Sequence, residues 1–296
     1  MDLFSKLFEA TGNNAKRDYP LKEYTTFKIG GPADYFVTPE TEEQVLHVIN
    51  IAKENSIPFF ILGKGSNILV PDEGFRGLVI NLSDKFNKIE SSQERIYAQS
   101  GATLTDVSKT ALVHSLTGLE FAIGIPGSLG GAVFMNAGAY GGEMKDCIHE
   151  VKFIRDNKIL TEHRENLEFG YRKSTFQKKN DIVIGAWLQL KKGNYDEIKA
   201  VMEELTQKRE EKQPLEMPSA GSVFKRPEGY FAGKLIQDSG LRGFKVGNAE
   251  VSTKHCGFIV NAGGATAQDV KGLVEEIQKR VKEKFGVELE REIRYL

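Results

Sequence analysis

The segment GIPGSLGGAVFMNAGAYGG, residues 124–142, says more about the fold than any other part of the chain. Seven of its nineteen residues are glycine, and most of the others are small or apolar. Glycine lets a backbone turn sharply and approach a partner closely. A mobile surface loop is the alternative, but the apolar residues favour burial; these are Ile125, Leu129, Val133, Phe134 and Met135. The composition therefore predicts a buried segment whose backbone packs against a large flat ligand.

A shorter glycine-rich segment, GKGSN, lies upstream at residues 63–67. It directly follows the apolar run Pro58–Leu62, which predicts a short strand. A glycine-rich turn after a strand can point several backbone N–H groups at one diphosphate. The segment is not a Walker A loop, and it is not a dinucleotide-binding fingerprint because position 68 is isoleucine. For this segment alone, a plain tight turn is an equally good interpretation.

Hydrophobic periodicity and turn residues around these two segments predict a mixture of helices and strands. Helices are expected at 41–55, with Thr41 and Gln44 as a capping box, and at 104–116, 195–212 and 266–285. Strands are expected at 58–62, 68–70, 78–81, 150–154, 158–163, 181–190 and 287–295, with a strand pair within 89–99. The two prolines in 214–218 indicate a linker. The predicted class is α+β, divided into residues 1–84, 85–212 and 213–296.

Composition argues against several classes of protein. The 40 Lys and Arg balance 41 Asp and Glu, which argues against a nucleic-acid-binding protein. The two cysteines, Cys147 and Cys256, are far apart, which favours a reducing compartment over a disulfide framework. We expect no secretory signal and no membrane insertion, and therefore a cytoplasmic protein. The five histidines are not expected to cluster, and no metal site is predicted.

Four further motifs occur in a fixed order with the two glycine-rich segments. They are YTTFKIGGPA at 24–33, FGYRKS at 169–174, AGSVFKRP at 220–227 and EREIR at 290–294. The ordered set, from about residue 20 to the end, resembles the UDP-N-acetylenolpyruvoylglucosamine reductases, in particular their shorter subgroup. The resemblance implies a two-part FAD-binding unit of the vanillyl-alcohol-oxidase (PCMH) type, followed by a substrate-binding domain. It also implies NADPH as hydride donor, a UDP-sugar substrate and a place in peptidoglycan precursor synthesis.

The resemblance gives both glycine-rich segments the role of holding FAD. The residues expected at the cofactor are Gly63, Lys64, Gly65, Ser66, Asn67, Gly124, Pro126, Gly127, Ser128, Gly130, Gly131, Asn136 and Gly138. Neither segment contains a histidine, the residue through which many enzymes of this fold bind FAD covalently. A non-covalent flavin is therefore expected.

The resemblance also assigns three catalytic residues. Arg172 matches the arginine that stabilises negative charge on the substrate, a task suited to its bidentate fork. Ser222 matches the proton donor, and Glu292 matches a second acid. Lys225 and Arg242 are expected to bind substrate. From composition and periodicity alone, a surface position is the favoured interpretation of Arg172 and a turn cap after Gly221 that of Ser222, while Glu292 is one of three glutamates on a polar face.

Two other functions stay open from the sequence alone. One is a different FAD oxidoreductase of the same fold, acting on a sugar or a hydroxy acid. The other is a nucleotide-binding protein without activity, which would be expected to lose at least one of the three candidate catalytic residues. No obligate protein partner is inferred.

Overall fold

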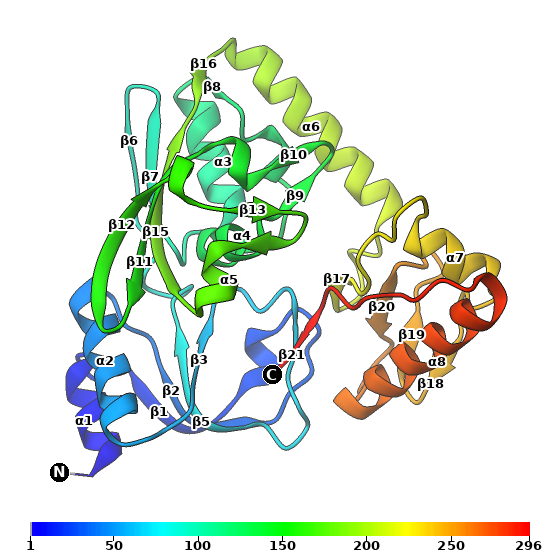
Figure 1. Ribbon diagram of the computed structural model, residues 1–296, viewed down its shortest axis with the longest axis horizontal. Helices are drawn as coiled ribbons and strands as arrows, with labels where there is room; N and C mark the ends of the chain where they lie inside the picture. The colour runs from blue at the N-terminus through cyan, green and yellow to red at the C-terminus, as the bar shows by residue number, and fades with distance from the viewer. Residues whose placement is uncertain (1) are drawn as a thin grey trace. The chain divides into compact units, whose positions relative to one another are not determined.

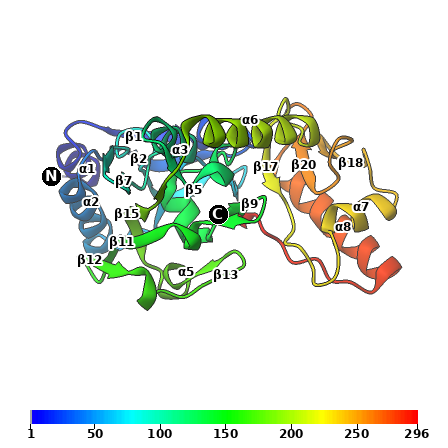
Figure 2. The same ribbon diagram turned by 90° about the horizontal axis from the view of Figure 1, so that it is seen from above.

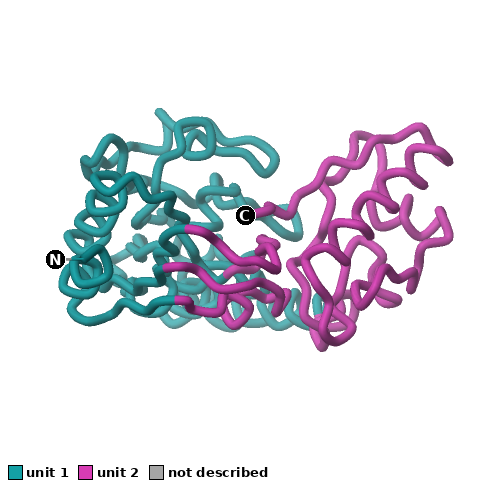
Figure 3. Tube along the Cα trace, turned by 90° about the horizontal axis from the view of Figure 1, so that it is seen from below, with its two compact units in different colours: residues 1–17, 35–64, 77–209 teal, residues 18–34, 65–76, 210–296 magenta. Residues whose placement is uncertain are grey.

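A computed structural model describes residues 2–296. Contacts between Cα atoms divide the chain into two compact units (Figure 3). Unit 1 comprises residues 1–17, 35–64 and 77–209, and unit 2 comprises 18–34, 65–76 and 210–296. The predicted boundary at 84/85 lies inside unit 1, and two N-terminal segments group with the C-terminal part. Sequence patterns missed this grouping because contacts between segments distant in the chain leave no local signal. The three-part division stays a prediction.

The N-terminal part contains two helices and a small sheet (Figure 1). The helices are α1 (Leu3–Ala10) and α2 (Glu42–Glu54). The strands are β1 (Ala15–Pro20), β2 (Pro32–Val37), β3 (Phe59–Leu62), β4 (Ile68–Leu69) and β5 (Phe75–Asn81), with sheet order β1-β2-β5-β3. Thr41 caps α2 by accepting the Gln44 N–H at 3.2 Å, as expected. The return bond reaches the Glu40 N–H at 2.7 Å, one residue before the predicted capping box.

The middle of the chain is built on a five-stranded antiparallel sheet in the order β12-β11-β15-β7-β6. Its strands are β6 (Ile89–Ser92), β7 (Arg95–Gln99), β11 (Ile148–Arg155), β12 (Lys158–His163) and β15 (Ile182–Gln189). Figures 1 and 2 show β12, β11, β15 and β7 side by side. Around the sheet are α3 (Leu104–Val113), α4 (Leu129–Met135) and α5 (Thr175–Lys179), with short strands β8 (Leu116–Thr117), β9 (Gly138–Ala139), β10 (Gly142–Glu143), β13 (Phe169–Gly170), β14 (Lys173–Ser174) and β16 (Lys191–Lys192).

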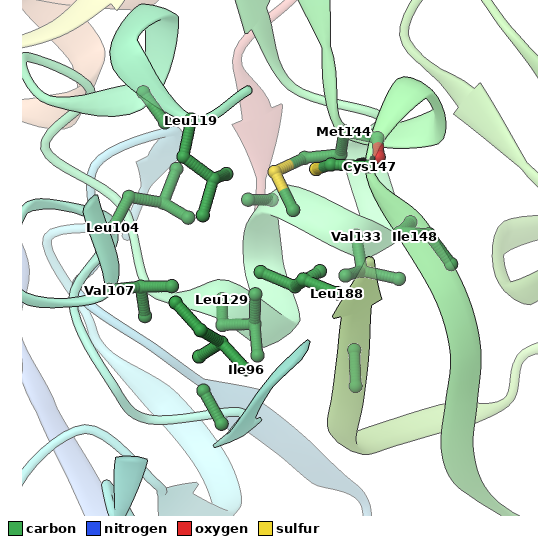
Figure 4. Close-up of a cluster of buried hydrophobic side chains, with 14 of the residues drawn as sticks. Ile96, Leu104, Val107, Leu119, Leu129, Val133, Met144, Cys147, Ile148 and Leu188 are labelled. Carbon is green, nitrogen blue, oxygen red and sulfur yellow. Dashed lines mark hydrogen bonds between the residues drawn. The ribbon is translucent and has the colours of Figure 1, made fainter. Parts of the chain in front are cut away.

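Helices α3 and α4 close the hydrophobic core over this sheet (Figure 4). Leu104 and Val107 come from α3, Leu129 and Val133 from α4, and Ile96 from β7; all are fully buried. Burying one such side chain contributes about 1.5–3 kcal/mol. The glycine-rich segment is therefore fixed to the core by its own apolar residues, as its composition predicted. It is not one continuous loop, however, because α4 lies within it.

Unit 2 contains a four-stranded sheet in the order β17-β20-β19-β18, with α7 (Ala232–Asp238) and α8 (Ala267–Phe285). The four strands of this sheet are β17 (Ser219–Ser222), β18 (Lys245–Val246), β19 (Ala249–Val251) and β20 (Phe258–Asn261). A further strand, β21 (Arg294–Tyr295), pairs with β4. Thr266 and Gly286 cap α8. Asp72 accepts the N–H of Ala267 at 2.8 Å, which ties residues 65–76 to the start of this helix.

Two expectations about long elements need correction. The predicted strand 287–295 is regular only at β21, which pairs in parallel with β4, because the preceding residues form only an isolated bridge at Arg291. Helix α6 (Tyr195–Lys212) forms as predicted, but its buried face is narrower than the apolar spacing of Ile198, Val201, Met202 and Leu205 predicts. Ile198 and Met202 are buried, whereas Val201 is 42% exposed.

Candidate functional site

The two glycine-rich segments meet at Gly63 and Ser128. A Cβ atom built on Gly63 would lie 2.2 Å from the Ser128 Oγ, a distance that real atoms do not tolerate. Gly63 follows the buried end of β3, and Ser128 precedes α4. The structure therefore brings together two segments that are about sixty residues apart in sequence, and a side chain at 63 would require the Ser128 hydroxyl to rotate away.

Gly130 and Gly131 are neighbours in α4 with different surroundings. A Cβ on Gly130 would lie 2.5 Å from the Ser100 Cβ, so packing within the protein accounts for this glycine. A Cβ on Gly131 would meet only the Ser128 Oγ, at an ordinary 3.5 Å, and Gly131 is exposed. No contact among the described residues requires glycine at 131, so the space in front of it fits the close approach of a ligand.

Local packing explains the second glycine of the first segment, Gly65. Gly65 has a φ of 61°, and a Cβ there would lie 2.0 Å from the Tyr24 carbonyl oxygen. The Thr26 N–H donates to the Gly65 carbonyl at 3.2 Å, so the motif 24–33 braces this turn. Glycine here is explained without a ligand. The tight-turn interpretation therefore holds for Gly65, while a cofactor role for Lys64, Gly65 and Ser66 stays a prediction.

Among the described residues, two uncharged, buried side-chain atoms beside the glycine-rich segments have no hydrogen-bond partner. They are the Asn81 Nδ2 and the Ser100 Oγ, on residues that are almost completely buried. Asn81 pairs with Leu62, which precedes Gly63, and the Ser100 carbonyl accepts the Gly130 N–H at 2.8 Å. A buried polar group without a partner costs about 1–3 kcal/mol, so both atoms call for a ligand or water. This pair fits the polar groups of a dinucleotide such as FAD.

Sequence reasoning missed Asn81 and Ser100 as cofactor candidates. A signal was present, because Asn81 is the last residue of the apolar strand β5 and Ser100 directly follows β7. Polar residues at strand ends gather at the edge of a sheet, where ligands commonly bind.

Arg172 lies at the turn of the β13–β14 hairpin. It adopts a left-handed φ of 54°, a backbone conformation that costs a non-glycine residue about 1–2 kcal/mol. Its Nη2 donates to the Gly138 carbonyl at 3.3 Å, and its guanidinium lies 5.0 Å from the centre of the Tyr171 ring. The hairpin therefore holds Arg172 against the second glycine-rich segment. This contact favours the catalytic interpretation over that of an ordinary surface arginine.

Asn136 connects the glycine-rich segment to this hairpin. It caps α4 with a left-handed φ of 44°, and its Nδ2 donates to the Gly170 carbonyl and to the Glu143 carboxylate, both at 3.0 Å. Its Oδ1 accepts the Lys145 N–H at 3.0 Å. The side chain is fully buried and used within the protein. Its role as a cofactor ligand stays a prediction, and these bonds favour positioning of the Arg172 hairpin.

Glu143 gives this region a negative charge. Burial by itself would raise the pKa of Glu143, but hydrogen bonds from Lys145 and Asn136 outweigh it and lower the pKa below its usual value. The positive charges of Lys145 and Arg172 act in the same direction. The carboxylate therefore stays ionised at neutral pH and helps to hold Arg172 in place.

Ser222 and Glu292 lie on neighbouring backbone segments of unit 2. The Glu292 N–H donates at 2.8 Å to the carbonyl of Val223, the residue after Ser222. The Asn67 Nδ2 donates to the Glu292 carbonyl at 3.3 Å, and the Arg294 N–H donates to the Asn67 carbonyl at 3.0 Å. Two predicted catalytic residues are thus brought together, with the end of the first glycine-rich segment beside them. Ser222 is the last residue of β17 and is exposed, which is not the expected turn cap.

The structure separates Glu292 from the two other glutamates of its segment, which periodicity could not do. Glu288 and Glu290 are exposed and form ion pairs with Lys282 and Lys225. Glu292 is partly buried. A partly buried carboxylate beside the Ser222 segment is the best placed of the three to act on a substrate.

The two predicted substrate-binding cations have protein partners. Lys225 pairs with Glu290 and lines a cavity of about 380 Å³ in unit 2, together with Arg226 and Tyr230. Arg242 donates to the Thr253 carbonyl and, at 2.7 Å, to the Gln237 Oε1. Lys225 therefore has access to a cavity, whereas the bonds of Arg242 favour a structural role. Substrate binding by either residue stays a prediction.

Arg209 in α6 is a cation that sequence reasoning missed. Its Cδ would lie 2.9 Å from a Cβ on Gly124, so its side chain covers the start of the glycine-rich segment. Burial lowers the pKa of Arg209, partly offset by Tyr140, and its Nε is buried without a hydrogen-bond partner. Because Arg209 lies in a helix with many charged residues, the sequence gave no indication that its side chain covers Gly124.

The expectation that the histidines do not cluster is wrong for two of the five. His149 and His163 come together with Glu150, and the ligand atoms of the three lie within 4.8 Å of one another. The pairing of β11 with β12, which places Glu150 opposite His163, creates this proximity. The spacing of residues within a single helix or strand could not predict this proximity.

Comparison with known proteins agrees with this arrangement. Two family models match the chain, an FAD-binding domain at residues 33–159 and the C-terminal domain of UDP-N-acetylenolpyruvoylglucosamine reductase at residues 213–296. A protein of that name from Clostridium botulinum is 56% identical over 99% of this chain and 96% of its own length. One from Caldanaerobacter subterraneus is 54% identical over 93% and 91%. This chain belongs to the UDP-N-acetylenolpyruvoylglucosamine reductase family.

A crystal structure from the same family, from Thermus caldophilus, has a similar fold. It is 38% identical in sequence, with a TM-score of 0.80, covering 95% of this chain and 97% of the other. The expectations of an α+β fold, of an FAD-dependent oxidoreductase and of this reductase family are therefore confirmed. Among residues 2–296, no helix has the length and apolar character needed to cross a membrane.

Proposed function

We propose that this chain is a cytoplasmic, NADPH-dependent flavoenzyme. It reduces the enolpyruvyl group of UDP-N-acetylglucosamine enolpyruvate to the lactyl ether of UDP-N-acetylmuramate, a step in making peptidoglycan precursors. The observation that carries the proposal is the near full-length identity to reductases of this name. All three residues that match the catalytic set of the family are present, which argues against a scaffold without activity.

Arg172 stabilises the negative charge that forms on the substrate. When bound, FAD supplies the hydride that adds to the enolpyruvyl double bond, and NADPH renews it. The addition leaves an enolate conjugated with the substrate carboxylate, and a planar guanidinium can grip such a group with two hydrogen bonds. The hydrogen bond to the Gly138 carbonyl and the negative charge of Glu143 orient Arg172 before substrate arrives. Because Arg172 is preorganised before the substrate binds, stabilising the enolate requires less reorganisation of the site.

Ser222 delivers the proton that completes the reduction. Its hydroxyl is exposed at the end of β17, and the O–H proton passes to the enolate carbon that bears the carboxylate, which is adjacent to the carbon that receives the hydride. A serine hydroxyl is a weak acid, so precise placement must compensate. The pairing of Val223 with Glu292 fixes this placement and keeps a second acid on the adjacent segment.

The test separates the two half-reactions in the Ser222→Ala variant. Flavin reduction by NADPH, followed as bleaching of the flavin bands, is expected to persist. Reoxidation by the enolpyruvyl sugar nucleotide should slow by roughly 10²–10⁴-fold, as expected when a general acid is lost. Ser219→Ala is the matched control, since it removes a serine hydroxyl at the other end of β17.

The possible outcomes of this test distinguish three alternatives to the proposed roles. Equal loss in both half-reactions would mean that Ser222 is structural. A wild-type protein that bleaches with NADPH but is not reoxidised by the enolpyruvyl substrate would point to another FAD oxidoreductase acting on a sugar or hydroxy acid. Failure to bleach with NADPH would contradict the proposed function as a whole.

A further inference from the structure

On the sheet of unit 1, a β-bulge directs two neighbouring side chains toward a third. The register of β11 against β15 shifts between Ile148 and Glu150, so His149 is an extra residue in the ladder. Successive strand residues normally point to opposite faces, and a bulge breaks this alternation. His149 Nε2 and Glu150 Oε1 consequently lie 3.4 Å apart.

The third member of the cluster comes from the edge strand β12. His163 is the register partner of Glu150, and its Nδ1 lies 3.1 Å from the Glu150 Oε1. The two imidazole rings are 5.8 Å apart, edge to face. Tetrahedral coordination at 2.0–2.2 Å places neighbouring ligand atoms about 3.4 Å apart. Two of the three separations already match this value, and His163, whose side chain is 58% exposed, can rotate to close the third.

We propose that His149, Glu150 and His163 form a binding site for a borderline divalent transition metal, Zn²⁺ or Ni²⁺. Two neutral imidazoles and one carboxylate carry a single negative charge, which suits a dication, and imidazole selects these metals over Mg²⁺ and Ca²⁺. Lys152, two residues along β11, does not neutralise Glu150 because it pairs with Glu42 at 2.9 Å. The site has three protein ligands and leaves one position open to solvent.

The chain provides a reporter beside this cluster. Trp187 is its single tryptophan and is the register partner of Glu150 on β15. It packs on Tyr97, and Lys152 lies 5.5 Å from its ring centre, which places Trp187 on the same face of the sheet as this part of β11. Ni²⁺ quenches nearby indole emission through its unfilled d shell, whereas Zn²⁺ does not. Quenching of Trp187 by Ni²⁺ therefore reports binding of the metal near Glu150.

The experiment titrates the FAD-loaded, chelator-treated protein, purified without a histidine tag, with Zn²⁺ by calorimetry and with Ni²⁺ by tryptophan fluorescence. We expect saturation at one metal per chain and quenching of Trp187. His163→Ala should weaken binding by roughly tenfold or more and abolish the quenching, since even the loss of a group that only supports a ligand costs 10–100-fold. His163 is exposed, so this variant should keep the fold.

His47→Ala is the matched control, because His47 is an exposed histidine on α2 outside the cluster. It should bind both metals as the wild type does. Glu150→Gln gives a second check, since it keeps the shape of the side chain but removes the charge, and it should also weaken binding. Equal affinity in wild type and His163→Ala, or titrations that do not saturate at one metal per chain, would overturn the proposal.

Discussion

Substituting Gly131 with alanine should make the protein without FAD more stable and its binding of FAD weaker. Gly131 lies in α4, does not have a positive φ, and is exposed; a Cβ would meet only the Ser128 Oγ at 3.5 Å. Alanine is favoured over glycine inside a helix by about 1 kcal/mol. The midpoint of thermal unfolding without FAD should therefore rise by roughly 2–4 °C.

The effect on FAD has the opposite sign if the cofactor occupies the space in front of Gly131. Adding a methyl group to a filled contact costs about 1–3 kcal/mol. Dissociation of FAD should consequently become easier by about one to two orders of magnitude. Two measurements test both halves of the prediction: thermal unfolding of the FAD-free protein by circular dichroism, and titration with FAD followed by flavin fluorescence.

Gly130→Ala is the matched comparison one residue away. Its Cβ would lie 2.5 Å from the Ser100 Cβ inside the core, so it should destabilise the FAD-free protein by about 1–3 kcal/mol. Wild-type FAD affinity in Gly131→Ala would refute the idea that this glycine serves the ligand. A lower unfolding midpoint in both variants would refute the assignment of different surroundings to the two glycines.

Two further predictions concern Arg172 and Cys147. Arg172→Lys keeps the positive charge but loses the bidentate fork, so reduction of the enolpyruvyl substrate should fall by roughly 10²-fold or more while flavin reduction by NADPH persists; equal rates for lysine and arginine would mean that charge alone suffices. Burial raises the pKa of Cys147 to about 12, so its thiol stays protonated at pH 8 and should resist iodoacetamide in the folded protein and react once the protein is unfolded in urea. Mass spectrometry of the alkylated peptide measures this, and rapid labelling of the folded protein would contradict the burial of Cys147.

The sequence predicted most elements with strong periodicity. Helices α2, α3, α6 and α8 and the strands of the central sheet all form close to their expected bounds, because local patterns of apolar residues fix them. The expected strand 287–295 failed because alternation shows only which side chains face inward. Leu289 and Ile293 are indeed buried, but ladder hydrogen bonds depend on a partner strand that the segment itself cannot reveal.

Prediction of the candidate site divides in the same way. The glycine-rich segments and the catalytic motifs stand out because their residue types are unusual. Asn81 and Ser100 were missed although they lie at or next to strand ends, because the unpaired atom of each is defined only by the folded protein, as is that of Arg209. The histidine cluster was missed because it depends on strand register and on a bulge, both of which are non-local.

The glycine-rich segment and the Arg172 hairpin are joined by hydrogen bonds. Asn136 caps α4 and donates to the Gly170 carbonyl, Arg172 donates to the Gly138 carbonyl, and the Ser174 hydroxyl donates to the Phe134 carbonyl, so hydrogen bonds in both directions tie the hairpin to the segment. Arg172 and Asn136 both adopt left-handed backbone conformations, which persist only when the surroundings enforce them. The energy of holding this strain comes from the buried core beneath α4. We therefore expect a ligand that orders the glycine-rich segment to order the Arg172 guanidinium as well, which would couple cofactor binding to charge stabilisation through the backbone of residues 136–138.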